Sequence, residues 1–192
     1  MDFIAKFDFP KLKERCLFFN SQVDQESIGN LTQDIIGINE QDEYLKKYYE
    51  IHNLIYVPKP IQIYIDSYGG EIYSCFGLLS IIKTSKTPVW TIATGTAMSC
   101  GFLILISGHK RFAYSLSTVM LHQAASGFHG KVRDMEDDLI ETKRLQSKIE
   151  DIIMEKTKIT RAKLDKIYKQ KIDWYLTLDD MIKFGVIDEP IN

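Results

Sequence analysis

Residues 95–101 read Gly95-Thr96-Ala97-Met98-Ser99-Cys100-Gly101, and this small-residue turn lies between two apolar runs. The run before it, Val89-Trp90-Thr91-Ile92-Ala93, has the β-branched and aromatic composition of a strand. The run after it, Phe102-Leu103-Ile104-Leu105-Ile106, ends at Ser107-Gly108 and indicates a buried helix. We therefore predict a strand–turn–helix unit with Ser99 at the helix N-terminus, where backbone N–H groups point outward.

A serine at this position has two interpretations. Its hydroxyl can face a cleft and attack a carbonyl group, whose developing negative charge the nearby N–H groups stabilise. It can also be a plain cap that hydrogen-bonds the first turn of the helix. Gly-x-x-x-Ser-x-Gly strings are common by chance, so this turn alone does not decide between the two.

Composition places the chain among ordinary globular proteins. It has 192 residues, of which 45% are hydrophobic and 26% charged, as expected for one domain with a sizeable core. The net charge of −2 gives no indication of a nucleic-acid partner. No apolar run reaches the roughly 18 residues of a membrane span, and Met1–Lys6 lacks the apolar core of a secretory signal. Cys16, Cys75 and Cys100 are too scattered to predict a disulfide framework or a metal site. We expect a cytoplasmic protein without cofactor, metal, nucleic-acid or membrane partner.

Strand and helix patterns extend from the turn toward the N-terminus. The predicted elements are a strand at Cys16–Phe19, a helix over Ser27–Ile38, a strand over Ile61–Ile65 and a helix over Glu71–Thr84. The stretch Asn39–Pro60 between them is polar and rich in tyrosine, and we expect only a short surface helix there, over Tyr44–Leu54. This order is typical of an α/β fold with right-handed crossovers.

The C-terminal half continues the alternation. The predicted elements are strands at Lys110–Tyr114 and Thr118–Leu121, a long helix over about Lys131–Lys156, a helix capped by Thr160, a strand at Asp173–Leu176 and a last helix that ends at Gly185. The long helix greatly exceeds the mean of about 11–12 residues. Because its outer face is heavily charged and its apolar stripe drifts, we expect it to pack against a second subunit as well as its own core.

Hydrolysis by a serine needs a nucleophile, a base, an acid that orients the base, and donors for the oxyanion. Ser99 is the candidate nucleophile, and His122, at the end of a predicted strand, is a candidate base. A lone histidine there is more often structural, and Asp173 is one of 26 acidic residues that spacing alone does not select. The backbone N–H groups of Gly70 and Cys100 are candidate oxyanion donors. The residues therefore support a serine hydrolase and do not identify its substrate.

Three motifs in order resemble the proteolytic subunit of the Clp protease. They are Ser67-Tyr68-Gly69-Gly70, the 95–101 turn, and Met120-Leu121-His122-Gln123, against the Ser-Pro-Gly-Gly, Gly-x-Ala-x-Ser-x-Gly and Met-Ile-His-Gln of that family. The resemblance covers nearly the whole chain except Asn39–Pro60. It implies a ClpP/crotonase-like α/β fold of repeated β-β-α spiral units with a protruding handle helix. It further implies a single domain, 1–192, with an N-terminal arm (1–15), an atypical insertion (39–60) and a handle region (124–157).

The resemblance also assigns roles by position. It implies that Ser99 is the nucleophile, His122 the general base and Asp173 the orienting acid, with the N–H groups of Gly70 and Cys100 as the oxyanion hole. Two edges would hold a substrate peptide as an added β-strand, a mode in which main-chain hydrogen bonds supply the affinity. These edges are Gly70-Glu71-Ile72 and Ala125-Ser126-Gly127.

For the assembly, the resemblance implies a serine endopeptidase that cuts unfolded polypeptides inside a homo-oligomeric chamber. The chamber would be a tetradecamer of two heptameric rings joined by the handle, with an AAA+ unfoldase as partner. Three departures are evident: Tyr68 and Ala124 replace prolines, and Ser126 replaces a glycine, which loosens the backbone near the peptide groove. With the 39–60 insertion and a short N-terminal arm, they suit a phage-encoded or otherwise specialised member.

Three other functions are alternatives. The first is a non-catalytic ring component, against which the presence of Ser99, His122 and Asp173 argues. The second is an acyl-CoA hydratase of the same superfamily, whose members lack this Ser–His pair. The third is a phage head-maturation protease that acts without an unfoldase, and the sequence leaves it open.

Overall fold

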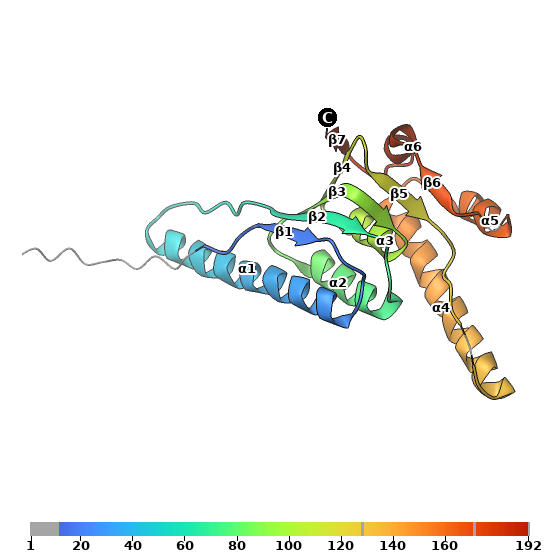
Figure 1. Ribbon diagram of the computed structural model, residues 1–192. Coiled ribbons are helices and arrows are strands. Elements are labelled where there is room, and N and C mark those ends of the chain that lie inside the picture. The colour runs from blue at the N-terminus through green and yellow to red at the C-terminus, as the bar shows by residue number, and fades with distance from the viewer. Residues whose placement is uncertain (1–11, 128, 171, 192) are drawn as a thin grey trace, which may run out of the picture.

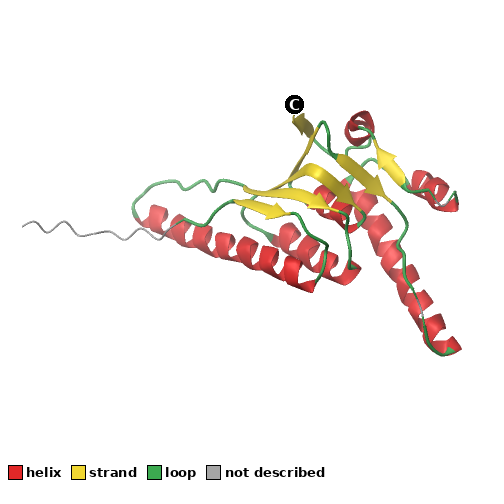
Figure 2. Ribbon diagram, in the orientation of Figure 1, coloured by secondary structure: helices red, strands yellow, loops and turns green. Residues whose placement is uncertain are grey.

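A mostly parallel sheet forms the centre of the computed structural model, which describes residues 12–127, 129–170 and 172–191. Most of the predicted arm 1–15 therefore lies outside the described residues. Figures 1 and 2 show the first two helices side by side on one face of this sheet, and the opposite face of the first strands is more open to solvent, as at Phe18 and Tyr64. The elements are β1 (Cys16–Phe19), α1 (Gln25–Ile51), β2 (Ile61–Ser67), α2 (Ile72–Thr84), β3 (Val89–Met98), α3 (Cys100–Ser107), β4 (Lys110–Tyr114), β5 (Thr118–Leu121), α4 (Val132–Lys156), α5 (Arg161–Lys169), β6 (Trp174–Leu176), α6 (Leu178–Lys183) and β7 (Glu189–Ile191).

The long strand β3 is central to the sheet because it pairs with three other strands. It is parallel to β2 on one side, and on the other side it pairs first with β4 and then, beyond Ala93, with β5. The order is β1-β2-β3-β4-β7, and β6 runs antiparallel to β5. The strands and crossover helices confirm the predicted α/β fold, although β7 was not predicted.

A register shift between β2 and β3 shapes the end of the sheet that leads to Ser99. Ile65 pairs with Ala93, whereas Ser67 pairs with Ala97. Asp66 fills the bulge, because its Oδ1 accepts hydrogen bonds from the Thr96 N–H at 2.8 Å and the Thr96 hydroxyl at 2.9 Å. A Cβ at Gly95 would stand 2.5 Å from that oxygen, so the bulge requires glycine there.

The core lies between the sheet and the helices, and α3 is its most buried helix. All eight residues of α3 are buried, which explains why its sequence is apolar on every face. Isoleucines of β2 and the inward faces of α1 and α2 complete the core. Burial of each such side chain contributes about 1.5–3 kcal/mol. Because α3 is held in the core, it fixes the position of the turn that precedes it.

The predicted long helix is confirmed as α4. Only its second half enters the core, through Leu145, Gln146, Ile149 and Ile153. The first half extends away from the body of the protein (Figure 1), and it leaves Val132, Leu139 and Ile140 exposed. This is the shape expected of a handle helix. None of the helices in the described part of the chain is both long and apolar enough to cross a membrane.

The prediction for Asn39–Pro60 was wrong. There is no separate surface helix at Tyr44–Leu54, because α1 continues without interruption to Ile51. Its buried face includes Asp42, whose carboxylate pairs with Arg15 and accepts hydrogen bonds from Tyr56 and Thr87. Asp42 interrupts the apolar pattern of the sequence. Its ion pair with Arg15 allows this charged residue to be buried, so the helix continues.

Candidate active site

Ser99 occupies the single position between β3 and α3. Its backbone has φ 53° and ψ −117°, a conformation that residues with a side chain rarely adopt and that carries about 1–3 kcal/mol of strain. Its side chain makes no capping hydrogen bond to α3, so the interpretation of Ser99 as a plain helix cap receives no support. The hydroxyl is left to face the neighbouring cavity.

The glycine turn at 69–70 packs against the start of α3. Gly69 has φ +98°, and a Cβ there would approach the Ser99 Cβ to 2.7 Å and the Cys100 nitrogen to 2.9 Å. On the other side, Val23 donates to the Gly69 oxygen at 2.8 Å and accepts from Glu71 at 2.7 Å. The N–H groups of Gly70 and Cys100 have no backbone partner among the described residues. Both groups are thus available as donors beside Ser99.

Parallel pairing of β3 with β5 brings His122 toward Ser99. Met98 pairs with Met120, and the Ser99 N–H donates to the Met120 oxygen at 3.0 Å. His122 follows directly after β5, and both side chains line one cavity of 630 Å³. Gly70 and Cys100 line the same cavity. Four of the residues predicted for catalysis therefore surround a single space.

The predicted substrate edges lie mostly at this cavity as well. Glu71 and Ile72 line it, and so do Ala125 and Ser126. Gly127 is exposed and does not line it.

Asp173 is placed by strand register rather than by contact. Leu121 pairs with Trp174 at the end of the antiparallel β5–β6 ladder, and His122 and Asp173 are the next residues beyond that last pair. Asp173 is exposed and does not line the cavity. Within the described part of the chain, no side-chain hydrogen bond links Ser99, His122 and Asp173. Such bonds are often long in unliganded sites and tighten when substrate binds.

Two buried thiols behind Ser99 were not predicted as part of the site. The Cys100 thiol donates to the Gly70 oxygen at 3.2 Å, and the Cys75 thiol donates to the Cys100 oxygen at 3.6 Å. The interaction of Cys75 with Cys100, together with burial, raises the pKa of the Cys75 thiol well above its ordinary value. Cys75 therefore remains a neutral donor that joins α2 to α3, and the Cys100 thiol joins α3 to the glycine turn.

The far wall of the cavity is apolar and comes from several elements. Leu103, Leu121, Leu145 and Ile149 form it, the last two from α4. At the rim, the Tyr73 hydroxyl donates to Glu141 Oε1 at 2.6 Å, and Arg144 donates to the same carboxylate. The Arg144 and Tyr73 hydrogen bonds lower the pKa of Glu141 to about 2. The Glu141 carboxylate, held by two hydrogen-bond donors, therefore lies beside a pocket suited to an apolar side chain.

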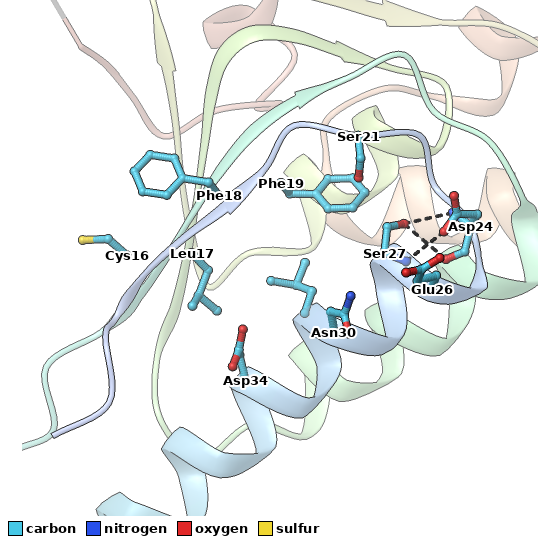
Figure 3. A pocket seen from close by; sticks show the side chains of 11 residues that line it. Cys16, Leu17, Phe18, Phe19, Ser21, Asp24, Glu26, Ser27, Asn30 and Asp34 are labelled. Atoms are coloured by element: carbon cyan, nitrogen blue, oxygen red, sulfur yellow. Dashed lines mark hydrogen bonds between the residues drawn. The ribbon is translucent and has the colours of Figure 1, made fainter. Parts of the chain in front are cut away.

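A second cavity, of 550 Å³, lies between β1 and α1 (Figure 3). Its polar residues include the carboxylates Asp24, Glu26 and Asp34, and its one α1 serine, Ser27, is engaged in a capping box with Asp24. No histidine lines it. Across the described residues, no cluster of three His, Cys, Asp or Glu side chains has the arrangement of a metal site. The cavity at Ser99 is therefore the candidate active site.

Comparison with known proteins agrees with this architecture. A profile of the Clp protease family matches residues 9–192. The chain is 28% identical over 183 residues to an ATP-dependent Clp protease proteolytic subunit from Deinococcus radiodurans, covering 94% of this chain and 82% of that protein. It is 33% identical over 139 residues to an ATP-dependent Clp protease proteolytic subunit 2 from Treponema pallidum, covering 71% of this chain and 68% of that protein. Because the profile spans almost the entire sequence and the parallel sheet and handle helix accompany it, the chain belongs to the Clp protease family.

Proposed function

We propose that this protein is a serine endopeptidase with Ser99 as nucleophile, His122 as general base and Asp173 as the acid that orients His122. The observation that carries the proposal is the shared cavity of Ser99 and His122, with the Ser99 hydroxyl not used as a helix cap. The family match adds independent support for a protease.

In the proposed reaction, the Ser99 oxygen bonds to the substrate carbonyl carbon while His122 takes the hydroxyl proton. The carbonyl oxygen becomes an oxyanion and accepts hydrogen bonds from the N–H groups of Gly70 and Cys100. His122 then gives the proton to the departing amine, which leaves an acyl group on Ser99. A water molecule, deprotonated by His122, then attacks the acyl carbon, and His122 returns the proton to the Ser99 oxygen as the acid is released.

The substrate would be an extended polypeptide. Its main chain would pair with Gly70-Glu71-Ile72 on one side and with the edge at Ala125, Ser126 and Gly127 on the other, so side-chain selectivity would be low. The apolar wall at Leu103, Leu145 and Ile149 favours an apolar side chain next to the cleaved bond. Unfolded chains satisfy both requirements more easily than folded proteins do.

We further propose that the active form is a ring assembly. The first half of α4 exposes Val132, Leu139 and Ile140 on a helix that projects from the body, and association would cover them. The two relatives are named as proteolytic subunits of an ATP-dependent Clp protease. By analogy we propose two stacked heptameric rings, with an AAA+ unfoldase supplying substrate.

Labelling with a fluorophosphonate tests the chemistry. We expect the native, assembled protein to be labelled at Ser99, and Ser99→Ala to be unlabelled with its native mass unchanged. Ser115→Ala, an exposed serine on the turn after β4, is the control and should label normally. An assembled wild-type protein that neither labels nor cleaves a fluorogenic peptide would overturn the proposal. Degradation of unfolded casein with and without an added unfoldase tests the partner separately.

A further inference from the structure

We propose that Gln146, on α4, is a positioning residue that holds the segment after His122 at the correct depth in the peptide groove. The proposal rests on the function proposed above, because the segment concerned is one of the two substrate edges. Gln146 lines neither that edge nor the reacting centre, so its action is through the backbone of Ala124.

The contact is a hydrogen bond between the backbone of Ala124 and the side chain of Gln146, and it is partly buried. The Ala124 N–H donates to Gln146 Oε1 at 2.8 Å, two residues after His122 and one before Ala125. The Gln146 side chain is almost enclosed, with 9% of its surface exposed. Within the described part of the chain, residues 123–127 make no other hydrogen bond. This single bond therefore ties the substrate edge to α4.

The amino group of the Gln146 side chain fixes the orientation of the amide. Gln146 Nε2 donates to Glu150 Oε1 at 2.9 Å. Turning the amide over would set N–H against N–H at Ala124 and oxygen against carboxylate at Glu150, so only one orientation satisfies both partners. A glutamate lacks the donor, and a lysine or methionine lacks the acceptor. The pair of contacts therefore selects glutamine at this position.

Glu150 is itself held from a third element. Arg161, at the start of α5, forms an ion pair with Glu150 and donates to Asp151 Oδ1 at 3.2 Å. A chain of polar contacts thus runs from α5 through Glu150 and Gln146 to the backbone beside His122. Each of these side chains is held by its contact with the next one, and this limits rotation of the Gln146 amide.

The position of Ala124 explains why this bond matters for the reaction. Ala124, Ala125 and Ser126 all line the cavity, and their backbone has to present its hydrogen-bonding groups at a fixed distance from Ser99. Without an acceptor at position 146, the Ala124 N–H has no protein partner and the segment is free to move outward. We expect weaker binding of extended peptides, with less change in the intrinsic reactivity of Ser99.

Gln146→Met removes the acceptor at nearly constant volume, and Ala124→Pro removes the N–H that it accepts. We expect Gln146→Met to speed exchange of the Ala124 N–H by about five- to tenfold, the effect of one lost hydrogen bond. The KM for a long extended peptide should rise by a similar factor, with kcat and the rate of fluorophosphonate labelling changed less. Lys143→Met, exposed on the same helix, is the matched control and should leave exchange and KM as in the wild type.

The double variant gives the decisive comparison. In the Ala124→Pro background, Gln146→Met should add no further change in KM, because the bond is already absent. Equal effects of Gln146→Met in both backgrounds, or unchanged exchange in the single variant, would overturn the proposal. If Ala124→Pro does not fold, Gln146→Glu replaces it: because it retains an acceptor, it should protect the Ala124 N–H better than methionine does, and equal exchange of this N–H in the two variants would overturn the proposal. The exchange measurement needs no catalysis, so it separates failure of this proposal from failure of the proposed function.

Discussion

The backbone N–H of Ser99 donates to the carbonyl oxygen of Met120 at 3.0 Å, which ties the turn carrying the candidate nucleophile to the strand carrying the candidate base. His122 lies only two residues beyond the acceptor, so any shift of the turn is passed directly to the Ser99–His122 pair. The turn itself is held by the buried helix α3 on one side and by Gly69–Gly70 on the other. Its rigidity therefore depends on backbone contacts, and variants that disturb those contacts test the site without removing a reactive group.

Ser99→Gly and Ser99→Ala separate the strain at Ser99 from its chemistry. Both remove the hydroxyl, so we expect peptide hydrolysis and fluorophosphonate labelling to be abolished. Because the backbone there has φ 53°, glycine should relieve strain and be more stable than alanine by about 1 kcal/mol. Thermal unfolding of the two variants measures this difference. A glycine variant less stable than the alanine variant would show that the backbone is unstrained.

Gly69→Ala should damage both stability and activity. The new Cβ would stand 2.7 Å from the Ser99 Cβ and 2.9 Å from the Cys100 nitrogen, at a backbone φ of +98°. We expect a loss of about 1–3 kcal/mol in the free energy of unfolding, and labelling of Ser99 should slow as the oxyanion donors move. Gly77→Ala is the matched control, since no atom lies within 4 Å of its Cβ position on α2, and helix propensity predicts that it stabilises by about 0.5–1 kcal/mol. Equal denaturation midpoints for the two variants would contradict the packing argument.

Glu141 should titrate far below an ordinary glutamate. The hydrogen bonds from Arg144 and Tyr73 lower its pKa to about 2, from an ordinary value of 4.5. A lowered pKa means that the carboxylate contacts are fully present above pH 4.5 and are lost as the pH falls toward 2. Carboxyl-detected NMR measures the midpoint directly. Arg144→Met should move the midpoint back toward 4.5, and Tyr73→Phe should move it less; a wild-type midpoint near 4.5 would rule out these contacts in solution.

Charged substitutions on the projecting half of α4 test the proposed assembly. Leu139 and Ile140 are exposed in the single chain, and Ile140 has 65% of its surface accessible. If association of subunits covers them, Leu139→Asp with Ile140→Asp should reduce the native mass to single rings or smaller species, because burying two carboxylates is costly. Glu136→Gln, a polar change on the same half of the helix, is the control. Light scattering that finds the same mass for all three proteins would exclude this surface from the interface.

Much of the fold follows from local patterns, and the exceptions have physical causes. The strand–turn–helix unit at Ser99 and the helix capped by Thr160 depend on neighbouring residues, and the structure contains both. The end of α1 was missed because Asp42 is acceptable inside only when Arg15, 27 positions away, neutralises it. The Cys100 thiol at the Gly70 oxygen is likewise a contact between distant segments. For Asp173, the relation to His122 depends on the β5–β6 ladder, whose last pair, Leu121 with Trp174, directly adjoins both residues, and no spacing rule in the sequence reveals this.

The final prediction concerns Asp42, which has 7% of its side chain exposed and is hydrogen-bonded by Arg15, Tyr56 and Thr87. Burial alone would raise its pKa, but these hydrogen bonds outweigh burial and lower the pKa below the ordinary 3.8. The stability that follows from this shift is therefore present above pH 3.8 and is lost as the pH falls through the lower value in the folded protein.

Asp42→Asn leaves the half-buried Arg15 without its counter-charge, so we expect a loss of about 1.5–3 kcal/mol near neutral pH. In this variant the free energy of unfolding should fall less as the pH is lowered, because the carboxylate whose pKa is shifted is absent. Glu43→Gln is the control: this neighbouring carboxylate makes exposed pairs with Lys47 and Lys86, which contribute at most about 1 kcal/mol. Urea unfolding of the three proteins between pH 3 and pH 7 makes the comparison. Parallel losses in Asp42→Asn and Glu43→Gln would mean that the Arg15 pair does not hold the C-terminal half of α1 to the sheet.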